Sequence, residues 1–220
     1  KDASIFQEYA LKTLGVKEEN MYFMTDATSG EMSQTIDLLS KILYKLGKKS
    51  ELIVYYAGHG YPDELTKVPY LIPVDVSATN LRSAIKLSEM YDKLSSTGAK
   101  KVTVFLDACF TGGGRTSGLV ASRGVKVKPK EGSLNGNLVV FSASSGEQSA
   151  LPYHKEGHGM FTYFLLKKLQ ESKGRLSFSE LETYLSDNVS ITSLKENRKE
   201  QDPKVNTSSK VINDWRNWKF

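Results

Sequence analysis

Hydrophobic side chains occur along this chain in two patterns, as short unbroken runs and as longer segments with helical spacing. Three runs are rich in β-branched and aromatic residues, namely 52–56, 102–106 and 138–143. Such runs are typical of strands buried on both faces of a sheet, because both sets of alternating side chains then need apolar surroundings. The sequence therefore predicts three central strands.

Apolar residues that recur every three or four positions mark the helices. In the clearest case Met32, Ile36 and Leu39 share one stripe, and Gly47 is suited to end that helix. Helices that alternate with apolar strands predict an α/β fold, with a mostly parallel central sheet between two layers of helices. The predicted helices are 2–14, 28–46, 87–94, 159–170 and 179 to about 189.

Several other segments give weaker signals. Residues 20–24 predict a short strand that ends near Asp26, and the glycines of 57–62 predict a turn after the first central strand. Residues 68–76 contain two prolines, which restrict them to an edge strand or a loop. Residues 112–136 are rich in glycine and charge and lack periodicity, which predicts a long flexible linker.

The C-terminal part of the chain is polar and charged over 193–204 and apolar again after Lys210. Its last residues, 210–220, predict either a final edge strand or a tail whose Trp215 and Trp218 dock on the body of the protein.

Composition limits the classes of protein to which the chain can belong. Its 220 residues, 39% hydrophobic and 25% charged, suit a single folded domain and exclude a disordered chain. The net charge of +5 is not gathered in a basic stripe with interleaved aromatics, so we expect no nucleic-acid partner. One cysteine excludes an internal disulfide and a cysteine-based zinc site, and no apolar run is long enough for a membrane span. The compartment is unknown, because a chain that begins with Lys1 says little about targeting segments.

Two reactive side chains follow central strands. Cys109 comes directly after one run, and His59 lies in a Gly-His-Gly sequence 50 positions earlier. Right-handed crossovers place the carboxyl ends of parallel strands at one edge of the sheet, where α/β proteins carry out their chemistry. A lone cysteine is usually a core residue and a lone Gly-His-Gly a plain turn, but together at two strand ends they predict a Cys–His dyad. The backbone N–H groups of Gly60 and Cys109 would then hold an oxyanion.

Two segments resemble motifs of the caspase family in its broad sense, YYAGHG at 55–60 and LDACFTGG at 106–113. The spacing between histidine and cysteine matches that family, whereas Asp107 stands where the animal caspases have glutamine. The chain is therefore more similar to metacaspases, paracaspases and bacterial caspase-like proteins. Further similarities occur at 142–150, 157–163 and 201–203.

The resemblance implies a three-layer caspase-like fold and a cysteine endopeptidase. Residues 1–220 form a single domain on this view, although the strand that usually precedes the first helix of the family is not recognisable before that helix: it is lost, cleaved away or supplied by another segment. Cys109 would attack the peptide carbonyl and His59 would transfer protons. Protein or peptide substrates are the expected partners. A monomer is expected, as in metacaspases, and a dimer formed through an edge strand stays open.

Acidic residues near the strand ends favour substrates with Arg or Lys before the scissile bond, which metacaspases and paracaspases prefer. Glu147, in the turn after 138–143, is the best candidate for the base of the pocket, although a solvated turn residue would show the same pattern. Asp26, Asp107 and Ser144 are further candidates for substrate binding, and we expect Asp107 to orient the nucleophile more than to touch the substrate.

The linker at 112–136 corresponds to a segment that family members often cleave during activation. An enzyme that cleaves after Arg or Lys carries its own target residues there, so we expect self-cleavage within 115–130 and treat the protein as a zymogen. A role limited to keeping the loop soluble is the alternative. The predicted processing residues are Arg115, Arg123, Lys126, Lys128 and Lys130.

No required cofactor is predicted. Calcium dependence is implied only by analogy with some metacaspases, because the sequence has no EF-hand spacing. His154 and His158 are four residues apart, as metal ligands can be, but the glycines beside His158 favour a role at the entry to the next helix.

Two other functions stay open. A catalytically inactive caspase-like interaction module is the main alternative, although such domains usually lose the cysteine or the histidine. A cysteine hydrolase of the same fold that acts on small amides is the other.

Overall fold

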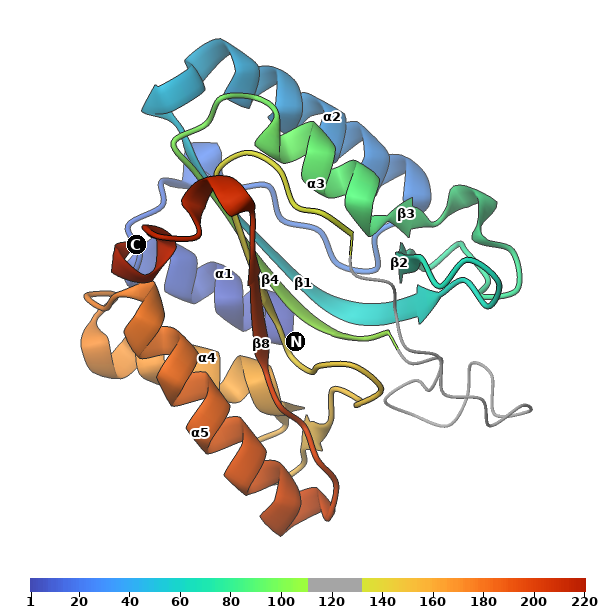
Figure 1. Cartoon of the computed structure of the whole chain (residues 1–220), viewed down its shortest axis with the longest axis vertical. Coiled ribbons are helices and arrows are strands. Elements are labelled where there is room, and N and C mark those ends of the chain that lie inside the picture. The colour runs from blue at the N-terminus through green and yellow to red at the C-terminus, as the bar shows by residue number, and fades with distance from the viewer. Residues whose placement is uncertain (111–131) are drawn as a thin grey trace.

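The computed structural model describes residues 1–110 and 132–220, which contain a six-stranded sheet (Figure 1). Its three central strands are parallel, and the strands on both sides of them pair antiparallel. In spatial order the strands are β3 (Ile85–Lys86), β2 (Pro69–Ile72), β1 (Glu51–Pro62), β4 (Lys101–Cys109), β5 (Leu138–Ser142) and β8 (Lys204–Thr207).

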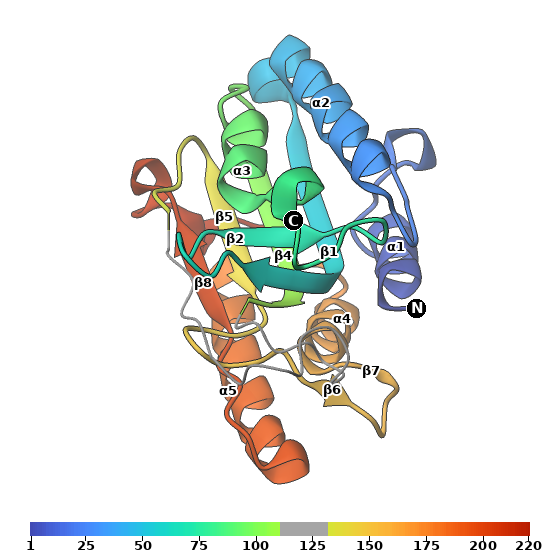
Figure 2. The ribbon, with the colours of Figure 1, turned by 90° about the vertical axis from the view of Figure 1, so that its right-hand side faces the viewer.

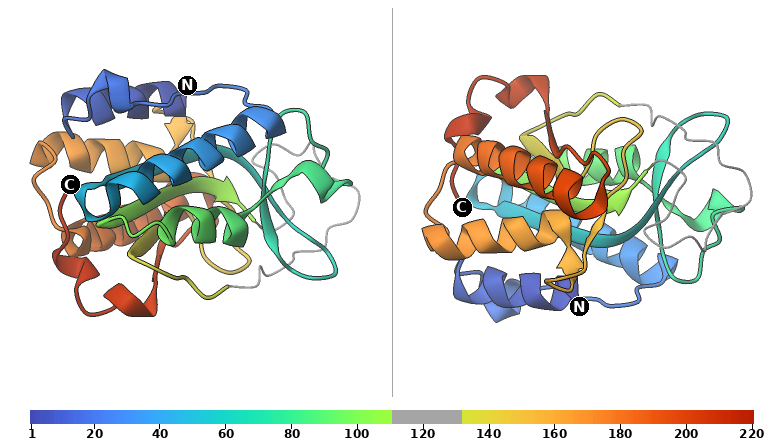
Figure 3. Two further views of the ribbon diagram at one scale, coloured as in Figure 1. Left: turned by 90° about the horizontal axis from the view of Figure 1, so that it is seen from above. Right: turned by 90° about the horizontal axis from the view of Figure 1, so that it is seen from below.

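Helices cover both faces of this sheet (Figure 2). On one face lie α2 (Ser29–Leu46) and α3 (Leu87–Ser95), and on the other lie α1 (Asp2–Lys12), α4 (Met160–Ser172) and α5 (Phe178–Asn197), as the two opposite views of Figure 3 show. A short hairpin of β6 (Pro152–Tyr153) and β7 (His158–Gly159) leads into α4. Short 3-10 turns occur at Glu18–Asn20, Gly47–Lys49, Leu81–Ser83, Ser209–Val211 and Trp215–Asn217.

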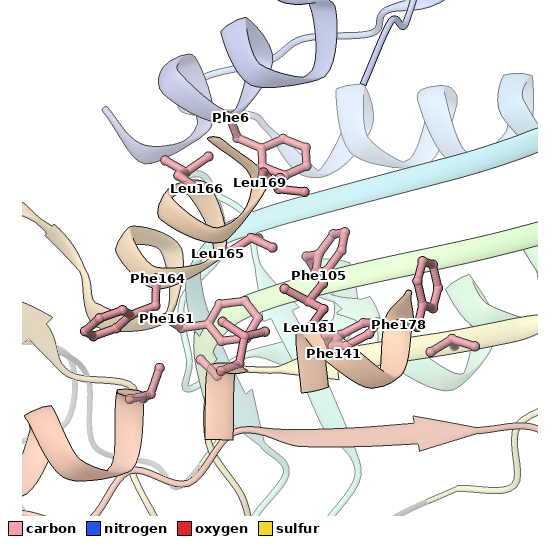
Figure 4. Packing of buried hydrophobic residues seen from close by; sticks show 14 of the residues in the cluster. Phe6, Phe105, Phe141, Phe161, Phe164, Leu165, Leu166, Leu169, Phe178 and Leu181 are labelled. Atoms are coloured by element: carbon pink, nitrogen blue, oxygen red, sulfur yellow. The ribbon is translucent and has the colours of Figure 1, made fainter. Parts of the chain in front are cut away.

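The sheet separates two hydrophobic cores. On the α4–α5 face, Phe105 of β4 and Phe141 of β5 stack with ring centroids 5.2 Å apart, and both belong to the cluster shown in Figure 4. Phe178 meets Phe141 edge-on at 5.5 Å, which is a favourable aromatic geometry. On the opposite face, Val104 and Leu106 of β4 pack in the cluster formed with α2 and α3. β4 is thus buried on both faces, as predicted, and forms a rigid base for the residues at its end.

Local sequence explains where two of the helices begin. Thr28 accepts a hydrogen bond from the Glu31 backbone N–H, and the Glu31 carboxylate accepts one from the Thr28 backbone N–H. Ser177 and Glu180 repeat this reciprocal arrangement at the start of α5. Each pair satisfies two backbone donors that the first helical turn leaves without partners. The local sequence therefore determines where these two helices begin.

The structure confirms the three central strands, the five predicted helices and the α/β fold with helices on both faces. No helix in the two described parts of the chain combines the length and the apolar character needed to cross a membrane.

The predicted turn at 57–62 is wrong. β1 continues through these residues and pairs with β4 as far as His59. The glycine at position 60 serves close approach instead, because a Cβ there would lie 2.4 Å from the Phe110 ring and 2.8 Å from the Cys109 carbonyl oxygen. Glycine is favoured both in turns and at close backbone contacts, so its presence alone does not distinguish the two.

The predicted strand at 20–24 is also wrong. After a 3-10 turn at Glu18–Asn20, Met21 is extended but the following residues pair with none of the described strands. An apolar run becomes a strand only where a neighbouring backbone supplies hydrogen bonds, and no strand within 1–110 or 132–220 does so here. Asp26 consequently ends no strand and lies in a bend with a φ of 51°.

Three further boundaries differ from the predictions. β2, within 68–76, pairs with both β1 and β3 and is therefore not an edge strand; its prolines lie at its first residue and just beyond its last. α5 runs to Asn197, into the polar stretch predicted to start at 193. The final edge strand is β8, and the tail at 210–220 docks on the body with Trp215 only 2% exposed.

Candidate active site at the ends of β1 and β4

The predicted nucleophile and histidine are direct partners in the sheet. Cys109 is the last residue of β4, and its partner in the parallel ladder is His59 of β1. Neighbouring strands lie about 4.8 Å apart and partner side chains project from the same face, so the two residues are neighbours at one sheet edge. Cys109 is 4% exposed, whereas His59 is exposed.

The Cys109 thiol is held by the backbone of Ala150. The Ala150 N–H donates to Sγ at 2.9 Å, and the thiol donates to the Ala150 carbonyl oxygen at 3.2 Å. Burial raises the pKa of the Cys109 thiol, and hydrogen bonds from the Ala150 backbone and the Ser149 side chain lower it by less. Burial thus favours the neutral thiol of Cys109, and a base is needed to form the nucleophilic thiolate.

Asp107 lies two residues before Cys109 on the same face of β4 and is fully buried. The Thr162 hydroxyl, in the first turn of α4, donates to its Oδ2 at 2.5 Å, and the Tyr55 hydroxyl lies 2.5 Å from Thr162 Oγ1. The amino end of a helix favours a nearby negative charge. This network ties β4 to β1 and α4 behind the thiol, which suits the expected orienting role. Contact between Asp107 and substrate stays a prediction.

The turn after β5 carries Ser144 and Glu147. The Ser144 hydroxyl donates to the Gln148 carbonyl oxygen at 3.2 Å. Ser144 also lines a cavity of about 410 Å³ that contacts Phe110 and Leu106 on the α3 side of the sheet. Glu147 is exposed and is not part of the lining of this cavity. The structure thus places the turn beside the candidate site, and a position of Glu147 at the base of the specificity pocket stays a prediction.

On the other side of the site, His59 and Asp26 line one groove of about 670 Å³ beside β1. Residues 21–27, α1 and α2 form its other walls. β2 pairs with β1 only from His59 onwards, so no described strand pairs with residues 51–58 on this side. Within the described residues, β1 therefore borders an open groove along 51–58.

Other predicted residues have mixed outcomes. Gly60 pairs with Leu71 of β2 and packs on Phe110, while its role in an oxyanion hole stays a prediction. The predicted linker lies mostly in 111–131, outside the described residues, and so do all five predicted processing residues: Arg115, Arg123, Lys126, Lys128 and Lys130.

His158 makes a local contact at the start of α4. Its Nδ1 lies 2.8 Å from Asp2 Oδ1, and Asp2 Oδ2 accepts a hydrogen bond from the Gly159 N–H at 3.0 Å. This arrangement attaches α1 to the entry of α4. Within residues 1–110 and 132–220 no three His, Cys, Asp or Glu side chains form a group suited to hold a metal ion. Calcium dependence stays an expectation from family analogy alone.

Sequence reasoning missed the contacts that surround the nucleophile. Ala150 and Thr162 were noted only within motifs, and Gln201 had no assigned role. Ala150 acts through its backbone, which no residue type reveals. Gln201 and Asp202 offered one signal, the family similarity at 201–203, but their partners Leu151 and Gln148 are about 50 residues away along the chain.

A family model described as the caspase domain matches residues 3–211. Among solved structures, caspase-1 from Spodoptera frugiperda is similar over 94% of this chain and 77% of its own, with 16% identity and a TM-score of 0.65. The protein GSU0716 from Geobacter sulfurreducens is similar over 99% of this chain and 87% of its own, with 17% identity and a TM-score of 0.62. A search of curated protein sequences found no match.

The chain therefore belongs to the caspase-domain family, whose members are cysteine-type peptidases. The two structural neighbours show the same three-layer caspase-like fold.

Proposed function

We propose that this protein is a cysteine endopeptidase that uses Cys109 as nucleophile and His59 as proton carrier. The observation that supports it best is the direct pairing of these residues at the ends of two parallel strands. Proximity of a thiol and an imidazole is the feature that nucleophilic cysteine catalysis needs, because a neutral buried thiol reacts only after losing its proton.

The reaction follows from these two side chains. The Cys109 sulfur bonds to the substrate carbonyl carbon, and its proton passes to His59. His59 then protonates the leaving amine as the peptide C–N bond breaks, which leaves a thioester on Cys109. Water, deprotonated by His59, attacks that thioester and releases the acid and the thiol. The Gly60 and Cys109 N–H groups are the proposed donors to the oxyanion.

We propose Arg or Lys before the scissile bond. Asp26 shares a groove with His59, and Glu147 lies on the exposed turn whose far end contacts Cys109. Both carboxylates lie near the surface of the site, where they can attract a cationic side chain, whereas Asp107 is buried behind it. The activity would not require calcium or any other cofactor.

A peptide panel tests activity and specificity together. Substrates that end in Arg, Lys, Asp or Leu before a fluorescent leaving group are incubated with the wild type, Cys109→Ala and His59→Ala. We expect cleavage after Arg and Lys only, with loss of at least roughly a thousandfold in both variants. Folded wild type that cleaves none of the panel would support the inactive interaction module, and cleavage after Asp would refute the basic specificity.

Self-cleavage is the second part of the proposal. The active protein should cut itself within 115–130, and the Cys109→Ala variant should stay intact. Mass spectrometry of both after prolonged incubation identifies the cut site. If the active wild type keeps its linker uncut, the Arg and Lys residues of 115–130 serve only to keep the loop soluble.

A further inference from the structure

The segment 144–151 connects β5 to β6 and brings a backbone group to the nucleophile. Ala150, fully buried near its end, both donates to and accepts from the Cys109 thiol. Within the segment, the Gln148 N–H donates to the Ser145 carbonyl oxygen at 3.0 Å, the Ser144 hydroxyl donates to the Gln148 carbonyl oxygen at 3.2 Å, and the Ser145 hydroxyl donates to Gln148 Oε1 at 3.4 Å. These three bonds do not involve Ala150, whose position also depends on groups outside the segment.

Gln201, just before β8, supplies the first of these groups. Its side chain is fully buried, and its Nε2 donates to the Ala143 carbonyl oxygen at 2.9 Å. Its Oε1 accepts from the Leu151 N–H at 2.8 Å. One amide thus joins the residue before the segment to the residue after Ala150. A glutamine amide offers a donor to one end of the segment and an acceptor to the other.

Asp202 holds the middle of the same segment. Its backbone N–H donates to Gln148 Oε1 at 2.7 Å, and its Oδ2 accepts from Gln148 Nε2 at 2.6 Å. Its Oδ1 accepts from the Ser190 hydroxyl of α5 at 2.6 Å. The pair at 201–202 therefore fixes the segment at its start, middle and end, and anchors it to α5.

We propose that Gln201 is a positioning residue for the nucleophile: it holds the segment 144–151 so that the Ala150 N–H reaches the Cys109 sulfur. Gln201 acts through Leu151, the neighbour of Ala150, and touches no reacting atom itself. An N–H donor stabilises a thiolate more than a thiol, so this contact favours ionisation of a sulfur that burial otherwise keeps neutral. An effect of Gln201 on peptide cleavage rests on the proposed peptidase function, whereas its effect on ionisation of the Cys109 thiol does not.

A test of this role must leave the other ionisable groups near the Cys109 thiol unchanged, because they also affect its pKa. His59 from β1 and Asp107 from β4 lie on the same face of the sheet as Cys109. Tyr55 of β1 lies on the same face, and the segment itself contributes one ionisable side chain, the exposed Glu147. A change of Gln201 to another neutral residue leaves all of these groups in place, so a shift in thiol ionisation reports the lost contact.

The experiment measures alkylation of the thiol by iodoacetamide as a function of pH, in the intact folded protein. Cys109 is the only cysteine, so the modification reports this residue alone. Gln201→Met keeps the length and bulk of the side chain but removes both hydrogen bonds. We expect the midpoint of the pH profile to rise by about one unit, which is roughly tenfold slower alkylation below the midpoint. The exposed Gln170 of α4 supplies the matched control, and Gln170→Met should keep the wild-type midpoint.

Circular dichroism and thermal unfolding establish that each variant is folded. Should Gln201→Met not fold, Gln148→Met tests the same idea, because it releases the middle of the segment from Asp202 and should raise the midpoint by a smaller amount. A folded Gln201→Met, or in its place a folded Gln148→Met, with the wild-type midpoint would overturn the proposal. A shifted midpoint in a protein that cleaves no peptide would refute the proposed peptidase function but not the positioning role.

Discussion

Cys109 and His59 are partners on adjacent strands, yet the two flanks that hold them are built differently. On the Cys109 flank, buried side chains connect β4, α4 and the segment 144–151 through short hydrogen bonds, among them those of Thr162 and Gln201. On the His59 flank, β1 borders a groove, and the extended residues 22–24 expose large apolar side chains beside it. One flank is closed and polar inside, and the other is open and apolar.

The difference shows which member of the pair the described fold positions more strictly. A buried hydrogen bond costs the most when one partner is lost, because the remaining group stays unsatisfied. Changes on the Cys109 flank should therefore be severe. On the His59 flank, the large side chains of residues 22–24 are exposed and should tolerate substitution, since exposed side chains contribute little to stability.

The largest effect is expected where the two flanks touch, at Gly60. In Gly60→Ala the new methyl group would overlap the Cys109 carbonyl oxygen and the Phe110 ring, so the strands must separate. We expect a loss of about 3 kcal/mol in the free energy of unfolding, together with loss of peptide cleavage. Urea denaturation measures the free energy of unfolding, and the peptide panel measures cleavage.

Gly30→Ala is the matched control for that change. A methyl group at Gly30, in the first turn of α2, meets no atom within 4 Å, so stability should stay the same or rise slightly. Equal destabilisation by both substitutions would mean that close packing at Gly60 is not the cause.

An intermediate effect is expected from Thr162→Val, on the Cys109 flank. The substitution keeps the shape of the side chain but removes the hydroxyl between Asp107 and Tyr55. A buried carboxylate then loses a hydrogen bond, which should lower the free energy of unfolding by about 2 kcal/mol at pH 7. Thr183→Val, on the exposed face of α5, is the control and should change it by less than about 0.5 kcal/mol. Equal changes in the free energy of unfolding for Thr162→Val and Thr183→Val would show that the buried hydrogen-bond network does not contribute to stability.

The smallest effect is expected from Phe23→Ser, on the His59 flank. Phe23 is 39% exposed, so its replacement should change the free energy of unfolding by less than about 0.5 kcal/mol. It should also leave the pH profile of Cys109 alkylation unchanged and reduce binding of a hydrophobic dye. A strong loss of stability or a shifted alkylation profile would contradict the contrast between the two flanks.

Several features of this protein were determined by the sequence alone. Apolar runs long enough to be buried on both faces identified the central strands, and stripes of apolar residues identified the helices, because burial follows directly from spacing. Thr28 and Ser177 set helix starts through residues three positions away. The pairing of Cys109 with His59 was also accessible, since parallel strands joined by right-handed crossovers bring their carboxyl ends to one edge.

Only the tertiary structure decided the rest, because the contacts concerned join residues far apart along the chain. Residues 20–24 have a strand-like pattern but find no partner strand in the described part of the chain, and Gly60 is required by a neighbour that lies 50 positions later. Gln201 meets Ala143 and Leu151 only after α4 and α5 have brought the chain back to the sheet. A side chain's identity states which hydrogen bonds it can make, and the fold determines with which groups it makes them.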